Sequence, residues 1–149
     1  MKSNELLQSA EGLFQIQPNT TSILSNASAF LMDALNQLNW VGFYLFDGQK
    51  LTVGPFQGKV ACSTIELGKG VCGEAASLRQ TVVVEDVLNY DNHIACDSNS
   101  RSEVVIPIII KNQLFGVLDV DSPIIKRFDT QTVSFLEQFT QLLVKTIDI

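Results

Sequence analysis

The sequence WVGFYLF at residues 40–46, followed directly by Asp47-Gly48, decides the fold of this chain. Aromatic and β-branched side chains dominate these seven residues, and both kinds favour strands. Asp-Gly between two apolar runs is a strong signal for a two-residue hairpin turn. Residues 50–56 supply the returning strand. We therefore expect an antiparallel hairpin near the centre of the domain.

Helical patterns lie on both sides of this hairpin in the chain. Residues 3–16 place apolar side chains at helical spacing, and a proline two residues beyond ends that helix. Asn19 or Thr20 can cap a second helix, whose apolar stripe runs over residues 23–38. Residues 129–147 predict a last amphipathic helix. Helices thus occupy both ends of the chain.

The remaining segments read as strands with one short helix inserted. The expected strands cover residues 60–66, 81–84, 104–110 and 113–120, and the helix covers residues 71–79. Pro107 cannot donate to a sheet, so it needs an edge position or a bulge. Hairpins between terminal helices predict an α+β fold, with a central antiparallel sheet covered by helices. We expect a single domain over residues 1–149.

Composition excludes several classes of function. The net charge is −6 and the pI is about 4.6, which disfavours nucleic acid because that partner requires a basic surface. No apolar run approaches the roughly 20 residues of a membrane helix. The first residues, MKSNELLQSAEGLF, lack the apolar centre of a signal peptide. We therefore expect a cytoplasmic protein that does not bind membranes.

Three cysteines, Cys62, Cys72 and Cys96, carry the possible redox chemistry. An odd number does not indicate a disulfide framework, and small buried cysteines are the plain alternative. Cys72 lies in Gly68–Gly73, which matches the glycine pattern of dinucleotide sites but in too short a unit. The glycines instead predict a tight turn into a helix. A thiol in the first turn of that helix would have a lowered pKa.

Cys96 lies in a long polar loop, residues 86–101. Loops of this length in compact domains usually carry function, and an exposed thiol is accessible for attack. Asp97 would raise the thiol pKa, and His93 could offset this as an imidazolium or a base. His93 and the three cysteines could also bind zinc, but the closely spaced cysteine pair of most zinc sites is missing. The missing pair therefore disfavours a zinc site.

Two acidic residues, Asp119 and Asp121, lie two positions apart on a predicted strand and so share one face. Neighbouring carboxylates raise each other's pKa when desolvated. They then require a cation, such as the ammonium of an amino acid, or they hold a shared proton that can be donated. The alternative is a strand end that frays into solvent before Pro123.

Trp40, Gly42 and Tyr44 also share one face of a strand. Two aromatic rings beside a glycine predict a slot for a small apolar group such as a thioether or a methyl. Ordinary core packing is the alternative.

Taken in order, these motifs resemble the free methionine-(R)-sulfoxide reductases, which are GAF-domain enzymes. The resemblance runs from Trp40 to Ser122. It rests on WVGFY at 40–44, GKGVCGEAA at 68–76, Asp86-Val87, HIACD at 93–97, SRSE at 100–103, GVLDVDS at 116–122, and the cysteine spacing. No motif position departs from the family pattern.

The resemblance implies a role for each site residue. Cys96 is expected to attack the sulfoxide sulfur, and Cys72 to close a disulfide with it. Cys62 is expected to be an auxiliary or alternative disulfide partner. Glu103, together with Asp119 and Asp121, is expected to hold the substrate ammonium and to supply a proton. Trp40 and Tyr44 are expected to enclose the sulfur and its methyl.

The same resemblance implies thioredoxin as the reductant, a homodimer as the assembly, and neither a metal nor an organic cofactor. The alternative function is a non-catalytic GAF module that senses a small ligand or the redox state.

Overall fold

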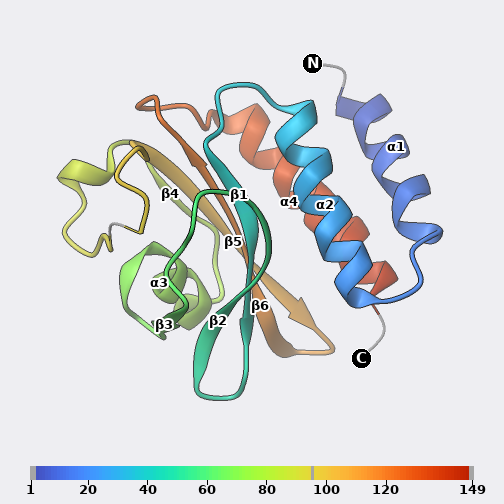
Figure 1. Ribbon diagram of the computed structural model, residues 1–149, viewed down its shortest axis with the longest axis horizontal. Helices are drawn as coiled ribbons and strands as arrows, with labels where there is room; N and C mark the ends of the chain where they lie inside the picture. Colours follow the sequence, from blue (N-terminus) through green and yellow to red (C-terminus); the bar gives the residue numbers. More distant parts are fainter. Residues whose placement is uncertain (1–2, 95, 148–149) are drawn as a thin grey trace.

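The computed structural model describes residues 3–94 and 96–147, so Ala95 of the loop motif lies outside the described residues. Four α-helices and six strands follow one another along the chain (Figure 1). In order they are α1 (Ser3–Gln15), α2 (Thr20–Ala34), β1 (Trp40–Phe46), β2 (Lys50–Gly58), β3 (Thr64–Glu66), α3 (Gly70–Leu78), β4 (Val82–Val84), β5 (Ser102–Ile110), β6 (Gln113–Ser122) and α4 (Thr130–Thr146).

The strands form one antiparallel sheet in the order β3-β2-β1-β6-β5-β4. The predicted β1–β2 hairpin is confirmed, and β1 lies inside the sheet between β2 and β6. Pro107 is tolerated because β4 pairs only with Glu103, Val104 and Val105 of β5 and ends before reaching it. The missing N–H therefore lies at a local edge, as the sequence required.

Helices α2 and α4 cover one face of the sheet, α1 packs on the outside of these two helices, and together they build the larger core (Figure 1). Alternate residues of β5 and β6, including Val104, Ile106, Leu118 and Val120, point to this face and are buried. Phe139 of α4 packs edge-on against Phe14 of α1 and stacks with Phe30 of α2. These contacts confirm the predicted α+β fold with terminal helices on the sheet.

Helix α3 packs on the opposite face, where a smaller apolar cluster forms. Its glycine-rich entry is a turn, as predicted: Gly68 and Gly70 have φ angles of 81° and 65°, which favour glycine. Gly73 permits close approach, because a Cβ there would lie 2.3 Å from the carbonyl oxygen of Glu66. Each glycine in this run therefore has a structural reason.

The third strand is shorter than predicted, since only Thr64–Glu66 pairs with β2. Residues 60–63 leave the sheet and carry Cys62 toward the loop that holds Cys96. No helix in the described ranges has both the length and the apolar character needed to cross a bilayer.

Candidate active site

A pocket opens on the face of the sheet that α3 covers. Its empty volume is about 480 Å³, counting the space open to solvent at its mouth. Strands β1, β5 and β6, the start of α3 and the Cys96 loop supply its walls. All eight predicted site residues except Cys62 line it: Trp40, Tyr44, Cys72, Cys96, Glu103, Asp119 and Asp121.

Three carboxylates lie side by side on the pocket floor because of strand register. Glu103 of β5 pairs directly with Asp121 of β6. Asp119 lies two residues before Asp121 on the same strand and therefore on the same face. The exposed fractions are 6% for Glu103, 5% for Asp119 and 8% for Asp121. The alternative of a strand end frayed into solvent is therefore wrong.

Burial raises the pKa of all three carboxyls well above their usual range. The second cause is mutual repulsion, since the charge of Asp121 raises the pKa of Asp119 and that of Glu103 raises the pKa of Asp121. One oxygen each of Asp119 and Asp121, both named Oδ1, is buried without a hydrogen-bond donor. This cluster therefore favours either a bound cation or retained protons.

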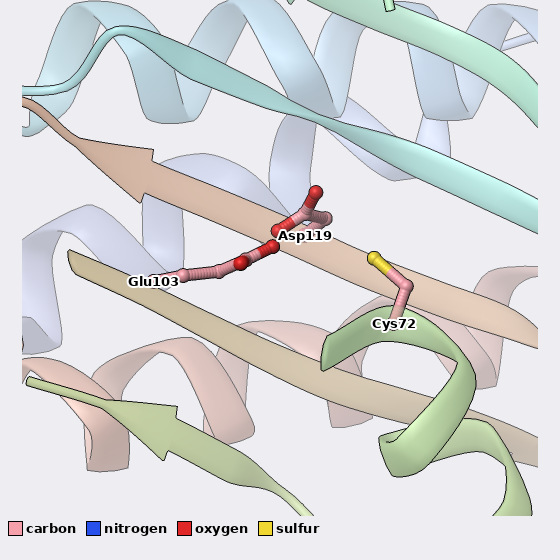
Figure 2. A group of neighbouring side chains, drawn as sticks. All are labelled: Cys72, Glu103 and Asp119. Atoms are coloured by element: carbon pink, nitrogen blue, oxygen red, sulfur yellow. The ribbon is translucent and has the colours of Figure 1, made fainter. Parts of the chain in front are cut away.

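Cys72 lies in the first turn of α3 as predicted, and Figure 2 shows its sulfur directed toward the carboxyls of Glu103 and Asp119. The expected lowering of its pKa is wrong. Burial raises the pKa of this thiol, and the charges of Asp119 and Glu103 raise it further. Helix polarity is therefore outweighed by desolvation and by nearby acids.

The structure contains a disulfide between Cys62 and Cys96, whose Cα atoms lie 5.3 Å apart. The expected pairing of Cys96 with Cys72 is therefore wrong for this structure, where Cys72 is a free, buried thiol. The reason is the short third strand, which frees Cys62 to approach the loop. The Tyr44 hydroxyl donates to the Cys62 carbonyl at 3.0 Å and fixes this approach.

The disulfide also removes two thiols from the zinc set considered above. The group whose ligand atoms do converge is Cys72, Glu103 and Asp119, which lie within 4.8 Å of one another (Figure 2). Their ligand atoms are one sulfur and two carboxylate oxygens.

The aromatic side chains that line the pocket do not form the slot that the sequence predicted. Trp40 stacks between Phe56 and Tyr44, at ring-centre distances of 5.0 and 5.8 Å. A Cβ at Gly42 would lie 2.8 Å from Cη2 of Trp40 and 2.2 Å from Cβ of Phe56. The space above the glycine is therefore filled, and the slot between the two rings is absent. Trp40 and Tyr44 still line the pocket.

His93 also lines the pocket, but not as a cation. Burial lowers its pKa, and its Nδ1 atom is buried without a hydrogen-bond partner. Of the two alternatives for His93, the imidazolium beside Cys96 is therefore disfavoured, and the base stays a prediction.

Asn39 holds the Cys96 loop against the sheet, a role that sequence reasoning missed. Its amide nitrogen donates to the Asp97 carboxylate and to the Ser100 hydroxyl, each at 3.0 Å. Its backbone N–H donates to the carbonyl oxygen of Asp121 at 3.0 Å. One residue thus links the loop to the strand that carries the buried acids.

Asn92 holds the other part of the loop against α3. Its side-chain oxygen accepts from the Gly70 N–H at 3.2 Å, and its amide donates to Glu74 at 3.1 Å. Tyr90 adds a hydrogen bond to the same glutamate. An asparagine in a polar loop suggests a turn, but nothing local in the sequence indicates that it caps a helix 22 residues away.

A GAF domain family model matches residues 19–147. The free methionine-R-sulfoxide reductase of Escherichia coli is 47% identical over 124 residues, covering 83% of this chain and 75% of the relative. The enzyme of the same name from Saccharomyces cerevisiae is 45% identical over 150 residues, covering 95% and 83%.

Solved structures agree with the sequence comparison. The structure of fRMsr of Staphylococcus aureus in complex with substrate superposes with a TM-score of 0.93 and 46% identity, covering 99% of this chain and 96% of that one. These likenesses extend over nearly the whole chain and include the pocket strands. The chain belongs to the free methionine-R-sulfoxide reductase family of GAF-domain proteins.

Proposed function

We propose that this chain reduces free L-methionine-(R)-sulfoxide to L-methionine with Cys96 as the nucleophile. The observation that carries the proposal is the convergence of Cys96 and three buried carboxyls in one pocket. The names of the Escherichia coli and Saccharomyces cerevisiae relatives support the substrate, as does the substrate complex of the Staphylococcus aureus protein.

The buried acids select for a free amino acid. Glu103, Asp119 and Asp121 form a cluster whose negative charge is poorly compensated, and an ammonium group would satisfy it. A methionine within a protein chain has an amide in place of that ammonium. Peptide-bound sulfoxide therefore lacks the group that this part of the pocket binds.

A carboxyl that stays protonated supplies the acid that the chemistry needs. The sulfoxide oxygen leaves sulfur only when it is protonated, and burial keeps a proton on this cluster at pH values where an exposed acid is ionised. The Cys96 sulfur attacks the sulfoxide sulfur, and the oxygen passes to Cys96. The products are methionine and a Cys96 sulfenic acid, so methionine gains the two electrons that the thiol loses.

Cys62 is the partner that resolves the sulfenic acid. Its thiol displaces hydroxide, which leaves as water, and the Cys62–Cys96 disulfide forms. The Cα separation of 5.3 Å is within the range that a disulfide requires. A thioredoxin-type dithiol then returns both cysteines to thiols. Cys72 lines the pocket beside the acids and takes no part in this disulfide.

The homodimer and the cytoplasmic location remain predictions, as does the single domain over the whole chain. The alternative function, a sensor module without turnover, shares the pocket but assigns no purpose to the paired cysteines beyond signalling.

The test is NADPH oxidation coupled through thioredoxin and its reductase. Free methionine-(R)-sulfoxide, the free S epimer and a peptide-bound sulfoxide are run side by side. Turnover of the free R epimer alone is the expected result. Binding of free methionine without turnover of any sulfoxide would favour the sensor instead.

A further inference from the structure

The Cys62–Cys96 disulfide lies at the rim of the pocket, and both cysteines are partly exposed. Two positions before each cysteine stands an apolar residue that faces solvent. Val60 is 88% exposed and Ile94 is 42% exposed. The pattern is therefore the same on both sides of the bond: an exposed branched apolar side chain, one residue, then the cysteine.

The first of these side chains has no role in the fold. Val60 is the most exposed large apolar side chain in the described part of the chain. It precedes the third strand, belongs to neither apolar cluster and does not line the pocket. Ile94 also lines the pocket, whereas Val60 is left without any contact of that kind. An exposed apolar side chain two residues from a reactive disulfide offers a surface that a second protein can bury.

We propose that Val60 and Ile94 form the docking surface for the protein dithiol that reduces the Cys62–Cys96 disulfide. The partner would present an apolar rim around its own two thiols, so that both apolar surfaces are buried when the sulfurs meet. This proposal rests on the proposed function only in taking the disulfide as a product of turnover.

The exchange follows ordinary thiol–disulfide chemistry. One partner thiolate attacks a sulfur of the disulfide and forms a mixed disulfide, which releases the other cysteine as a thiolate. The second partner thiol then attacks the mixed disulfide and frees the remaining cysteine. Two electrons pass from the partner's dithiol to this chain, and the partner leaves as a disulfide.

A small dithiol and a protein dithiol make different demands on this surface. Dithiothreitol needs only to reach the two sulfurs, which are partly exposed. A thioredoxin-type protein must also cover the residues that flank them. Removing the apolar side chain of Val60 should therefore slow the protein reductant and spare the small one.

The experiment uses the full chain with its disulfide formed and contains no sulfoxide, so its result does not depend on whether the chain turns over methionine sulfoxide. Second-order rate constants for reduction by reduced thioredoxin and by dithiothreitol are measured by acid quench, thiol alkylation and mass. Val60→Ser is compared with the parent. Ile16→Ser is the matched control, since Ile16 is 76% exposed and directly follows α1, which packs with the helices on the other face of the sheet.

For Val60→Ser we expect the thioredoxin rate constant to fall about fivefold or more, consistent with the loss of one buried apolar contact. The dithiothreitol rate constant should stay within about twofold, and Ile16→Ser should change neither. The proposal is overturned if Val60→Ser leaves the thioredoxin rate within twofold of the parent. It is equally overturned if both reductants slow in parallel, because Val60 would then act on the disulfide itself.

Discussion

The two faces of the sheet are built from the same strands but bury different kinds of side chain. On β6, Leu118 and Val120 point toward the helical layer and belong to its apolar core. Asp119 and Asp121, on alternate positions of the same strand, point into the pocket and are also buried. The change of environment occurs from one residue to the next.

The difference shows where stability and function are separated in this fold. The helical face gains from burial of apolar surface and contains aromatic contacts centred on Phe139. The pocket face buries acids whose charged forms are disfavoured there, and this opposes folding as those acids ionise. Substitutions on the helical face should therefore lower stability and spare activity, whereas substitutions of the pocket acids should lower activity.

The largest expected effect on stability comes from the helical face. Phe139→Ala removes a fully buried ring and should lower the free energy of unfolding by about 3–5 kcal/mol. Turnover by the protein that remains folded should be unchanged, because Phe139 is on the other side of the sheet from the pocket. Urea unfolding and the coupled assay measure the two quantities. Gln141→Ala, exposed on the same helix, is the control, and an equal loss in both variants would contradict the comparison.

Substitutions of the acids on the pocket face should lower catalytic activity. Asp119→Asn and Asp121→Asn should each lower kcat/KM by more than tenfold, or about 1.4 kcal/mol, because the amide neither attracts an ammonium nor donates a carboxyl proton. Asp91→Asn, exposed in the loop, should leave kcat/KM unchanged. Values within twofold of the parent would make both aspartates part of the scaffold only.

The same acids should make stability depend on pH. The usual pKa is 3.8 for both aspartates, and burial raises it in the folded protein. The folded chain therefore keeps protons that the unfolded chain loses near pH 4, so the free energy of unfolding should fall as pH rises above that value. Each such group contributes at most about 1.4 kcal/mol per pH unit, up to its folded pKa.

Asp121→Asn removes one of these groups, so its free energy of unfolding should fall less steeply as pH rises. Urea unfolding of the parent and of Asp121→Asn across this pH range measures the two slopes. Parallel curves would show that Asp121 is not protonated in the folded state.

The smallest expected effect on activity comes from Asn39, and Asn26 on the helical face is its control. Asn39→Ala removes the two side-chain hydrogen bonds that hold the Cys96 loop, and should lower kcat about threefold by loosening the loop. Asn26→Ala removes an exposed side-chain hydrogen bond to Gln17 on the helical face and should leave kcat unchanged. The same change in both variants would deny Asn39 a role in positioning the loop.

The helical face was largely predictable from the sequence, and so were the strands. Apolar periodicity is a local signal, and it identified the terminal helices and the central hairpin within a few residues. Alternation on one strand likewise placed Asp119 and Asp121 together, because the period of a strand is fixed by its geometry.

The rest of the pocket depends on contacts between distant segments. Cys62 pairs with Cys96 across 34 residues, and Asn39 reaches Asp97 across 58. No local pattern encodes how a long polar loop folds back, so the choice between Cys62 and Cys72 could not be made from spacing. The raised pKa of Cys72 was missed for the same reason, since it arises from burial of the thiol in the fold and then from the charges of acids on β5 and β6.

A single turnover in the absence of reductant tests the central claim most directly. Fully reduced protein is mixed with excess free methionine-(R)-sulfoxide, the methionine released is counted, and the disulfide is mapped by peptide mass. We predict one methionine per chain and a disulfide joining Cys62 to Cys96, and no methionine from Cys96→Ser. Methionine release by Cys96→Ser, or a disulfide that joins Cys72 to Cys96 in the parent, would contradict the account.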